Sequence, residues 1–348
     1  MHLAAVASPN GLGHLQRLLG VAEVLAERSM LTRLSIVATA WQRAVARNSA
    51  EPLVPITHWN TRIFEPKLRY LGAFPDVYGA ATIWADRMRE DEDLFNASVV
   101  ISDNLAITLA ARPDAVLAGS FLWQDVWPDS EFVSWEVALL REYSPPMLCN
   151  QWLATDSVLS QTRPRLCSWT ARRTSAEPEK EASRPLVEFN VGATGMQLSR
   201  AIEIITNLVN RGHLIQATPT ILAALPPSLR GNVNLRSAVP SLAVTRPGAQ
   251  SISEYAARGI PVAVMYEVTN AEMVHNARRL VALEIAVDLA QDDAATAADR
   301  IEAALMPAQL AELRYRLLAM PSLGLEEMAD YIQSMFRSRM AGACRGQG

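Results

Sequence analysis

The stretch VTRPGAQSISEYAARGIP (residues 244–261) leads from the end of an apolar segment through a glycine into a helical pattern. Gly248 stands at the junction, where the lack of a Cβ lets the backbone turn sharply, and Ser251 and Glu254 follow at three-residue intervals. Residues three apart share one face of a helix. Free amides at the positive end of the helix dipole favour an anion such as a diphosphate, and Glu254 could accept hydrogen bonds from ribose hydroxyls. The alternative is that Ser251 and Glu254 are ordinary first-turn residues.

Apolar segments that stop at small or polar residues recur on both sides of this stretch. Such segments are typical of buried parallel strands. They lie at residues 2–8, 34–39, 98–104, 115–121, 186–192, 213–218, 242–246 and 261–266. Helical spacing of apolar residues follows three of them, at residues 15–25, 197–211 and 249–258. The alternation predicts an α/β fold of two Rossmann-like, doubly wound domains. In the first helix, Glu23 falls outside the apolar stripe.

A charged, proline-punctuated stretch at residues 170–185, TARRTSAEPEKEASRP, interrupts this alternation. It has no apolar periodicity, so we interpret it as the linker between an N-terminal domain, residues 1–169, and a C-terminal domain, residues 186–324. Residues 325–340 have the pattern of an amphipathic helix, so the C-terminal segment, residues 325–348, could pack back on the first domain. The two domains are expected to face each other across a cleft.

Composition places the chain among ordinary globular proteins. Of the 348 residues, 50% are apolar and 20% are charged, and the formal net charge is -4. This balance argues against nucleic-acid binding, which depends on clustered cations. Cys149, Cys167 and Cys344 have no metal-binding spacing and cannot all pair, which favours a reducing cytoplasm. No apolar stretch approaches the ~20 residues of a membrane span, and the N-terminal run is too short for a signal peptide.

Four strand ends carry the glycine and polar residues that we expect to form the site. Ligands of open α/β sheets bind beyond the carboxyl ends of the strands. The candidates are Gly11, Gly13 and His14 after the first strand, Asp103 after the third, Gly192, Thr194 and Gly195 after the fifth, and Arg246 to Glu254. For His14, on a strand-to-helix turn, the alternative is a helix-capping histidine.

The segment TRPGAQSISEYAARGIPVAV, with NAEMVHNARRL (residues 270–280) after it, resembles the donor-binding half of the MurG-type N-acetylglucosaminyltransferases and their relatives of glycosyltransferase family 28. Those enzymes have the two-domain GT-B fold. The resemblance implies that Glu254 holds the ribose of the donor nucleotide and that Gly248 and Ser251 lie beside its diphosphate. The resemblance also implies that Arg246 and Asn276 belong to the donor site and that Glu272 contacts the sugar. Where the family more often has glutamines, this sequence has Glu272 and Met273.

The N-terminal segment NGLGHLQRLLGVAEVLA (residues 10–26) is similar to the Gly-x-Gly-His-x-x-Arg motif of GT-B transferases and of related nucleotide-sugar hydrolases, and this resemblance adds Arg17 to the candidates. VGATG (residues 191–195) takes the place of that fold's second glycine loop. The sequence has no Glu-x7-Glu pair, the signature of retaining GT-B enzymes, so inversion is favoured. The Asp-x-Asp at residues 91–93 is a metal-binding signature in the other large glycosyltransferase fold. Here it lies in a charged run and is interpreted as a solvated helix face.

An aromatic cluster precedes the linker. Its members are Phe121, Trp123, Trp127, Trp135 and Trp152. Tryptophan most often fills protein cores, but aromatic rings also stack on sugars and anchor at membrane interfaces. Two interpretations stay open, packing in the core and an acceptor-binding surface on the first domain.

The resemblance implies an inverting, metal-independent glycosyltransferase that moves a sugar from a nucleoside diphosphate, expected to be UDP, to a hydroxyl acceptor. No cofactor other than the donor substrate is expected. A sugar, a lipid-linked molecule and a small molecule all remain candidate acceptors, and a lipid-linked one would bring peripheral contact with the inner membrane face. The oligomeric state also stays open.

The transfer requires a base that removes the proton of the acceptor hydroxyl. His14 is favoured because histidine is largely neutral at cytoplasmic pH, with Asp103 orienting it or the acceptor. The reverse assignment stays open. Two other functions also remain: a nucleotide-sugar hydrolase or epimerase on the same fold, and a non-catalytic nucleotide-sugar binder.

Overall fold

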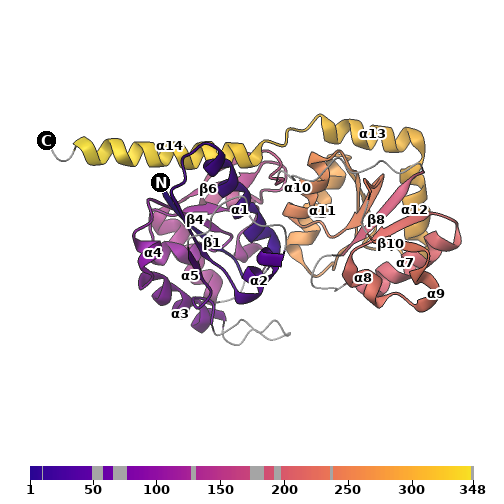
Figure 1. The fold of residues 1–348 in the computed structure, drawn as a ribbon, viewed down its shortest axis with the longest axis horizontal. Helices are drawn as coiled ribbons and strands as arrows, with labels where there is room; N and C mark the ends of the chain where they lie inside the picture. Colours follow the sequence, from indigo (N-terminus) through magenta and orange to yellow (C-terminus); the bar gives the residue numbers. More distant parts are fainter. Residues whose placement is uncertain are drawn as a thin grey trace. The chain divides into compact units, whose positions relative to one another are not determined.

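The computed structural model describes residues 1–9, 11–48, 58–65, 77–126, 131–172, 184–191, 197–235 and 238–345. The chain divides into two compact units, Met1–Arg172 with Leu323–Gly348 (the N-terminal unit) and Arg173–Ser322 (the C-terminal unit). Each unit contains a parallel sheet flanked by helices (Figure 1). None of the described helices combines the length and the apolar content that crossing a membrane would need.

The sheet of the N-terminal unit has seven described strands in the order β3-β2-β1-β4-β5-β6-β7. Their bounds are β1 His2–Ala7, β2 Arg33–Val37, β3 His58–Asn60, β4 Val99–Asp103, β5 Val116–Ala118, β6 Pro146–Asn150 and β7 Arg163–Cys167. The strands pair in parallel, so their carboxyl ends lie along one edge. The register pairs Ala7 of β1 with Asp103 of β4. Two of the strand ends singled out in the sequence are therefore neighbours.

Helices cover both faces of this sheet. They are α1 Leu12–Glu27, α2 Ala40–Asn48, α3 Val77–Arg89, α4 Glu92–Phe95, α5 Glu131–Tyr143, α6 Asp156–Gln161 and α14 Gly324–Arg345, with 3₁₀ turns η1 Ala106–Ala110 and η2 Trp123–Asp125. Alternate residues of the central strands enter two apolar clusters, one with α1 and α14 and the other with α3 and α5. Side chains two residues apart in a strand point to the same face of the sheet. Ile101 of β4 belongs to the apolar cluster that includes α1, so the side chain of Asp103 also faces α1.

Helix α1 is buried on nearly every side. One face packs on the sheet and α14 covers much of the other, and a Cβ at Gly20 would lie 2.5 Å from Cδ1 of Leu325. Glu23, outside the apolar stripe in the sequence, is nonetheless only 5% exposed. Its carboxylate forms an ion pair with Arg172, which satisfies the charge in this position.

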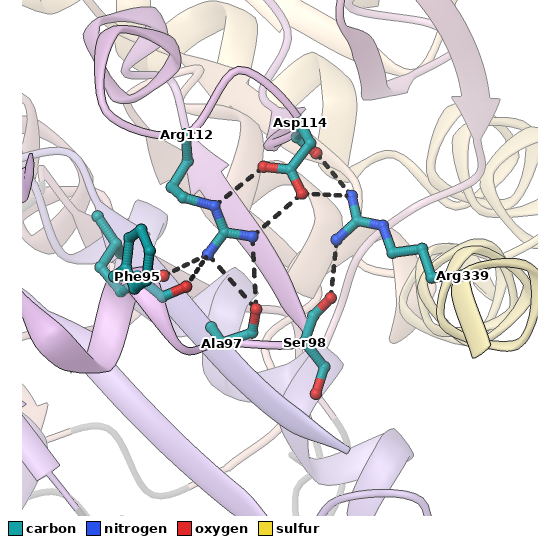
Figure 2. A network of polar contacts seen from close by, with 7 residues as sticks. Phe95, Ala97, Ser98, Arg112, Asp114 and Arg339 are labelled. Carbon is teal, nitrogen blue, oxygen red and sulfur yellow. Dashed lines mark hydrogen bonds and ion pairs between the residues drawn. The ribbon is translucent and has the colours of Figure 1, made fainter. Parts of the chain in front are cut away.

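Arg339 attaches α14 to the edge of the sheet at which β4 and β5 begin (Figure 2). Its guanidinium donates to the carbonyl oxygens of Ser98, at 2.7 Å, and Asp114, at 3.0 Å, and pairs with the Asp114 carboxylate at 2.8 Å. Arg112 binds the same carboxylate at 2.9 Å. Burial acts to raise the pKa of Asp114, but the Arg112 and Arg339 guanidiniums outweigh it and hold that pKa below its ordinary value.

The linker predicted at residues 170–185 begins later in the structure. Thr170 is 2% exposed, and the side chain of Arg172 binds Glu23 and Gln16. Residues 170–172 thus belong to the N-terminal unit, because Thr170 is buried and Arg172 binds two side chains of α1. The rest of the predicted linker, apart from residues 184 and 185, lies outside the described residues.

The sheet of the C-terminal unit has the order β10-β9-β8-β11-β12-β13, again with parallel pairings. Its strands are β8 Leu186–Asn190, β9 Leu214–Ala217, β10 Val233–Leu235, β11 Leu242–Thr245, β12 Val262–Val264 and β13 Ala286–Asp288. Its helices are α7 Leu198–Asn210, α8 Pro219–Ala224, α9 Pro227–Arg230, α10 Ala249–Ala257, α11 Ala271–Ala282, α12 Ala294–Leu305 and α13 Pro307–Leu318. Both α7 and α12 contribute to the apolar cluster of this unit.

Candidate functional site

A histidine, an arginine and an aspartate meet at the carboxyl edge of the N-terminal sheet. Asp103 ends β4 and is fully buried, and His14 lies in the first turn of α1. Nδ1 of His14 is 2.8 Å from Oδ1 of Asp103. Arg17, one turn further along α1, donates from NH1 to both carboxylate oxygens at 3.1 Å. The structure thus brings together three predicted site residues that lie up to 89 positions apart in the sequence.

The Asp103 contact determines which nitrogen of the imidazole is available. An ionised carboxylate only accepts hydrogen bonds, so Nδ1 of His14 carries the proton and Nε2 has the free lone pair. The side chain of His14 is 18% exposed, and within the described part of the chain no group hydrogen-bonds to Nε2. This arrangement suits a base that is oriented from behind and accepts a proton at Nε2.

Gln42 of α2 holds the loop between β1 and α1. Its Nε2 donates to the carbonyl oxygens of Ser8, at 2.8 Å, and Gly11, at 2.7 Å, while its Oε1 accepts from the backbone N–H of Thr39. Gln42 is fully buried, and sequence reasoning missed it because no pattern marks a glutamine that supports a loop 31 residues away. Gly11 precedes α1, and Gly13 lies in its first turn.

Gly248 stands at the start of α10, as the sequence predicts, but its backbone conformation does not require glycine. Its φ of -70° and ψ of 134° are open to any residue, so the expected sharp glycine turn is wrong. Instead, no described atom beyond its chain neighbours lies within 4 Å of where a Cβ would stand. As the N-cap of α10, Gly248 provides no side-chain hydrogen bond to the first turn of the helix.

Ser251 and Glu254 occupy the first turns of α10. Ser251 is half-buried and Glu254 is exposed, so both side chains are accessible from outside the unit. Gln250 donates from Nε2 to Oε1 of Glu254 at 3.0 Å, which orients the carboxylate and leaves its other oxygen to accept elsewhere.

Two contacts shape the turn that precedes α10. Arg246 forms an ion pair with Glu267 at 2.8 Å, and Gln197 donates to the other oxygen of Glu267 at 3.3 Å. Asn276 of α11 is 1% exposed and donates from Nδ2 to the carbonyl oxygen of Pro247 at 2.9 Å. Asn276 therefore supports the turn, and this contact by itself does not require a ligand. Glu267 was missed, although it follows the apolar run at 261–266, which would have marked it as a strand-end residue.

Of the other predicted donor-site residues, the structure describes only Glu272. Glu272 is half-buried in the first turn of α11, whose N-cap is Asn270. Gly192, Thr194 and Gly195 lie outside the described residues.

A buried carboxyl group connects α10 to the sheet. Glu188, in the middle of β8, is fully buried. The Tyr255 hydroxyl of α10 donates to its Oε1 at 2.5 Å, and Gln216 donates to its Oε2 at 2.8 Å. The signal in the sequence was a lone glutamate inside the apolar run LVEFNV, and sequence reasoning passed over it.

A second buried carboxyl group lies in the N-terminal unit. Glu136 of α5 is 1% exposed and accepts a hydrogen bond from the backbone N–H of Trp123 at 3.0 Å. Burial raises the pKa of Glu136 to about 8, and the nearby charge of Asp125 acts in the same direction. Glu136 is therefore mostly protonated at neutral pH.

Most of the aromatic cluster packs in the core. Phe121 and Trp123 are each 5% exposed and meet edge to face, with ring centroids 5.4 Å apart. Trp152, after β6, is half-buried and lies against the buried Trp169, at 4.5 Å between centroids. Trp135 is half-buried, and Trp127 lies outside the described residues. An acceptor-binding surface stays a prediction for the two half-buried rings, Trp135 and Trp152.

The acidic run at residues 91–93 is not the solvated helix face expected from the sequence. Asp91 caps α4 by accepting from the backbone N–H of Leu94 at 2.7 Å. Asp93, whose side chain is 14% exposed, pairs with Arg33 and lies 3.6 Å from Nδ1 of His58. These carboxylates are used to hold α4 against the strands.

Solved structures share the architecture of the two units. A crystal structure of CalG4, the calicheamicin glycosyltransferase, is 16% identical over 96% of this chain and 98% of its own, with a TM-score of 0.65. The chain has the GT-B fold. UGT2 of Phytolacca americana, complexed with UDP-2-fluoro-glucose and pterostilbene, is 13% identical over 98% of this chain and 99% of its own, with a TM-score of 0.69.

The spinosyn rhamnosyltransferase SpnG, complexed with thymidine diphosphate, also has this fold. It is 17% identical over 93% of this chain and 98% of its own, with a TM-score of 0.60. No protein-family model matches the sequence, and a search of curated proteins finds no match either. The MurG-type resemblance therefore stays a prediction beyond the fold.

Proposed function

We propose that this chain is an inverting, metal-independent glycosyltransferase that moves a sugar from a nucleoside diphosphate, UDP in the first instance, to a hydroxyl acceptor. The observation that carries the proposal is the His14–Asp103 pair, 2.8 Å apart at the carboxyl edge of the sheet in a chain with the GT-B fold. Ligands of open α/β sheets bind at that edge.

In this reaction His14 acts as the base. Nε2 takes the proton of the acceptor hydroxyl as its oxygen attacks the anomeric carbon, so the new carbon–oxygen bond forms while the bond to the diphosphate breaks. Attack from the face opposite the leaving group inverts the anomeric configuration. Asp103 stabilises the imidazolium that forms, and Arg17 fixes the carboxylate through its two hydrogen bonds.

The leaving diphosphate is proposed to lie at the N-terminus of α10. The positive end of the α10 dipole, at which the N-cap Gly248 has no side chain, favours a dianion there, and Ser251 adds a hydroxyl donor. Glu254 would accept hydrogen bonds from the ribose hydroxyls. Among the solved structures of this fold, UGT2 holds a uridine donor analogue and SpnG holds thymidine diphosphate, so both nucleotides are candidates for this chain.

The test combines UDP- and dTDP-sugars with a panel of hydroxyl compounds that includes quercetin and pterostilbene, with product mass and anomeric configuration as readouts. His14→Ala should lower kcat by roughly a hundredfold or more while nucleotide affinity stays close to that of the wild type. His58→Ala, at a histidine whose side chain is 46% exposed in the same unit, is the matched control and should retain activity.

Each other outcome points elsewhere. A far greater loss in Asp103→Asn than in His14→Ala would make the aspartate the base. Normal turnover in both variants would show that the catalytic site does not lie at the carboxyl edge of the N-terminal sheet. Free sugar released as fast as any transfer would favour a hydrolase, and nucleotide binding without turnover on any acceptor would favour a binding protein.

A further inference from the structure

Two buried polar atoms at the carboxyl ends of β1 and β4 have no hydrogen-bond partner among the residues that the structure describes. They are Nδ2 of Asn104, in a residue 4% exposed, and Oγ of Ser8, in a residue that is fully buried. The residues adjoin each other at the ends of β4 and β1, since the backbone N–H of Ser8 donates to the carbonyl oxygen of Asp103 at 3.2 Å. Buried polar groups are nearly always paired, so two orphans at one place need an explanation.

The backbone of Asn104 is held in place by hydrogen bonds within the protein. Its backbone has a φ of 54°, in the left-handed region that asparagine tolerates better than most residues. Its N–H donates to the carbonyl oxygen of Ala118 at 2.7 Å, and its own carbonyl accepts from Nε1 of Trp123 at 2.9 Å. The residue is therefore fixed from both sides.

Gly119 makes room for the Asn104 side chain. Gly119 has a φ of +142°, and a Cβ at that position would lie 3.1 Å from Oδ1 of Asn104. Any larger residue would be strained in its own backbone and would press on the carboxamide. The fold thus holds the carboxamide at one place at the carboxyl end of β4, against Gly119, and its NH2 group has no acceptor among the described residues. A preorganised donor of this kind is suited to a ligand.

We propose that Asn104 and Ser8 bind the acceptor substrate. The Asn104 carboxamide donates to a second oxygen of the acceptor, close to the hydroxyl that reacts at His14, and the Ser8 hydroxyl completes the contact. This inference rests on the proposed function and narrows it. The preferred acceptors carry neighbouring oxygens, as vicinal hydroxyls or as a hydroxyl beside a carbonyl, rather than an isolated hydroxyl.

The experiment compares Asn104→Gly and Ser8→Ala with the wild type. Glycine keeps the left-handed backbone without steric cost, and alanine removes only the hydroxyl. The matched control is Asn150→Ala, at a buried asparagine that ends β6. Its carboxamide is used inside the protein, donating to the Ser168 carbonyl at 3.3 Å and accepting from the Trp152 N–H at 2.9 Å.

Thermal unfolding should separate the two kinds of residue. Because neither Asn104 nor Ser8 loses a side-chain hydrogen bond within the protein, their variants should unfold within about 2 °C of the wild type. Asn150→Ala should unfold several degrees earlier. For transfer to quercetin, which has neighbouring oxygens, kcat/KM should fall about tenfold in Asn104→Gly and severalfold in Ser8→Ala, with nucleotide affinity unchanged. For pterostilbene, whose hydroxyl is isolated, the fall should be much smaller.

Wild-type transfer with unchanged acceptor kinetics in both variants would overturn this inference and leave the proposed function intact. So would an unfolding loss as large as that of Asn150→Ala together with an equal loss on both acceptors, since the two groups would then serve the structure. Absence of transfer by the wild type to any compound of the panel would overturn the proposed function and this inference with it.

Discussion

Asp103 shows how burial prepares a charged residue for one role. Its carboxylate is fully removed from solvent, and Arg17 occupies both of its oxygens at 3.1 Å. A buried charge without such a partner would be strongly destabilising. With Arg17 in place, the carboxylate is held in one orientation and can accept the Nδ1 proton of His14. The position of the candidate base thus depends on an arginine that is itself 6% exposed.

The exposed carboxylate of Glu254 is the residue on which the donor assignment depends. Glu254→Ala should weaken the binding of UDP or dTDP by roughly 2 to 3 kcal/mol, since it removes charge-assisted hydrogen bonds to the ribose. Isothermal titration calorimetry measures the change. Glu203→Ala, at another exposed glutamate of the same unit, is the control. Unchanged nucleotide affinity in a folded Glu254 variant would refute the assignment.

Helix α10 is positioned by groups that are remote from any expected ligand contact. Tyr255 ties it to Glu188 in the sheet, and Asn276 of α11 holds the turn before it through Pro247. In the N-terminal unit, α14 plays a comparable part by covering α1, which carries His14 and Arg17. In both units the elements behind the site determine where its side chains lie.

The attachment of α14 can be tested at Arg339. Arg339→Ala removes two hydrogen bonds to backbone carbonyls and an ion pair with Asp114, and should lower the free energy of unfolding by about 1 kcal/mol. Arg337→Ala, at an exposed arginine two positions away, is the control and should be neutral. Denaturant unfolding measures both. Equal losses in the two variants would contradict the prediction.

The stabilisation provided by the Arg339–Asp114 ion pair should depend on pH. The pKa of Asp114 lies below its ordinary value in the folded protein, with Arg112 and Arg339 responsible. Its contribution to stability is therefore present above the unfolded pKa and lost as the pH falls through the folded one. The difference in stability between wild type and Arg339→Ala should shrink in acid. A difference that grows below pH 4 would contradict this sign.

Glu136 should produce the opposite dependence. Burial raises its pKa to about 8 from an ordinary value of 4.5, so between these values the folded protein holds a proton that the unfolded chain has lost. This group therefore makes the protein less stable as the pH rises across that window. Glu136→Gln keeps an oxygen for the Trp123 N–H and does not titrate, so its stability should fall less between pH 5 and pH 8. Parallel wild-type and variant curves from urea unfolding would refute this.

The distribution of tryptophans along the chain makes it possible to tell which unit binds a ligand. All 8 tryptophans lie at or before Trp169, in the N-terminal unit, so their fluorescence reports on that unit alone. Nucleotide at about a hundred times its Kd should stabilise the unit that binds it by about 2.7 kcal/mol. UDP or dTDP should therefore raise the unfolding midpoint seen by circular dichroism more than that seen by tryptophan fluorescence. A rise confined to the tryptophan signal would contradict a donor site on α10.

Local patterns in the sequence were enough to predict the α/β class, the two sheets and most central strands. Each apolar run, such as residues 98–104, overlaps a strand of the structure, here β4. The four edge strands, β3, β7, β10 and β13, and the inner strand β6 were not predicted. Edge strands are short and only partly buried, so they need no continuous apolar run, as RPRLC of β7 illustrates. The position of residues at strand ends also identified His14 and Asp103 as site candidates, and the Gly-x-Gly-His-x-x-Arg resemblance added Arg17.

Only the tertiary structure decided which of these residues meet. His14 and Asp103 are 89 positions apart, and their contact follows from the register that pairs β1 with β4. Gln42 was missed for the same reason, since the loop that it supports lies 31 residues away. Glu267 and Asn104 were missed although each stands at the end of an apolar run, at residues 261–266 and 98–104. Apolar periodicity records whether a residue faces the interior, which is a local property. It does not record what the residue faces there, because that depends on the order and register of strands brought together by folding.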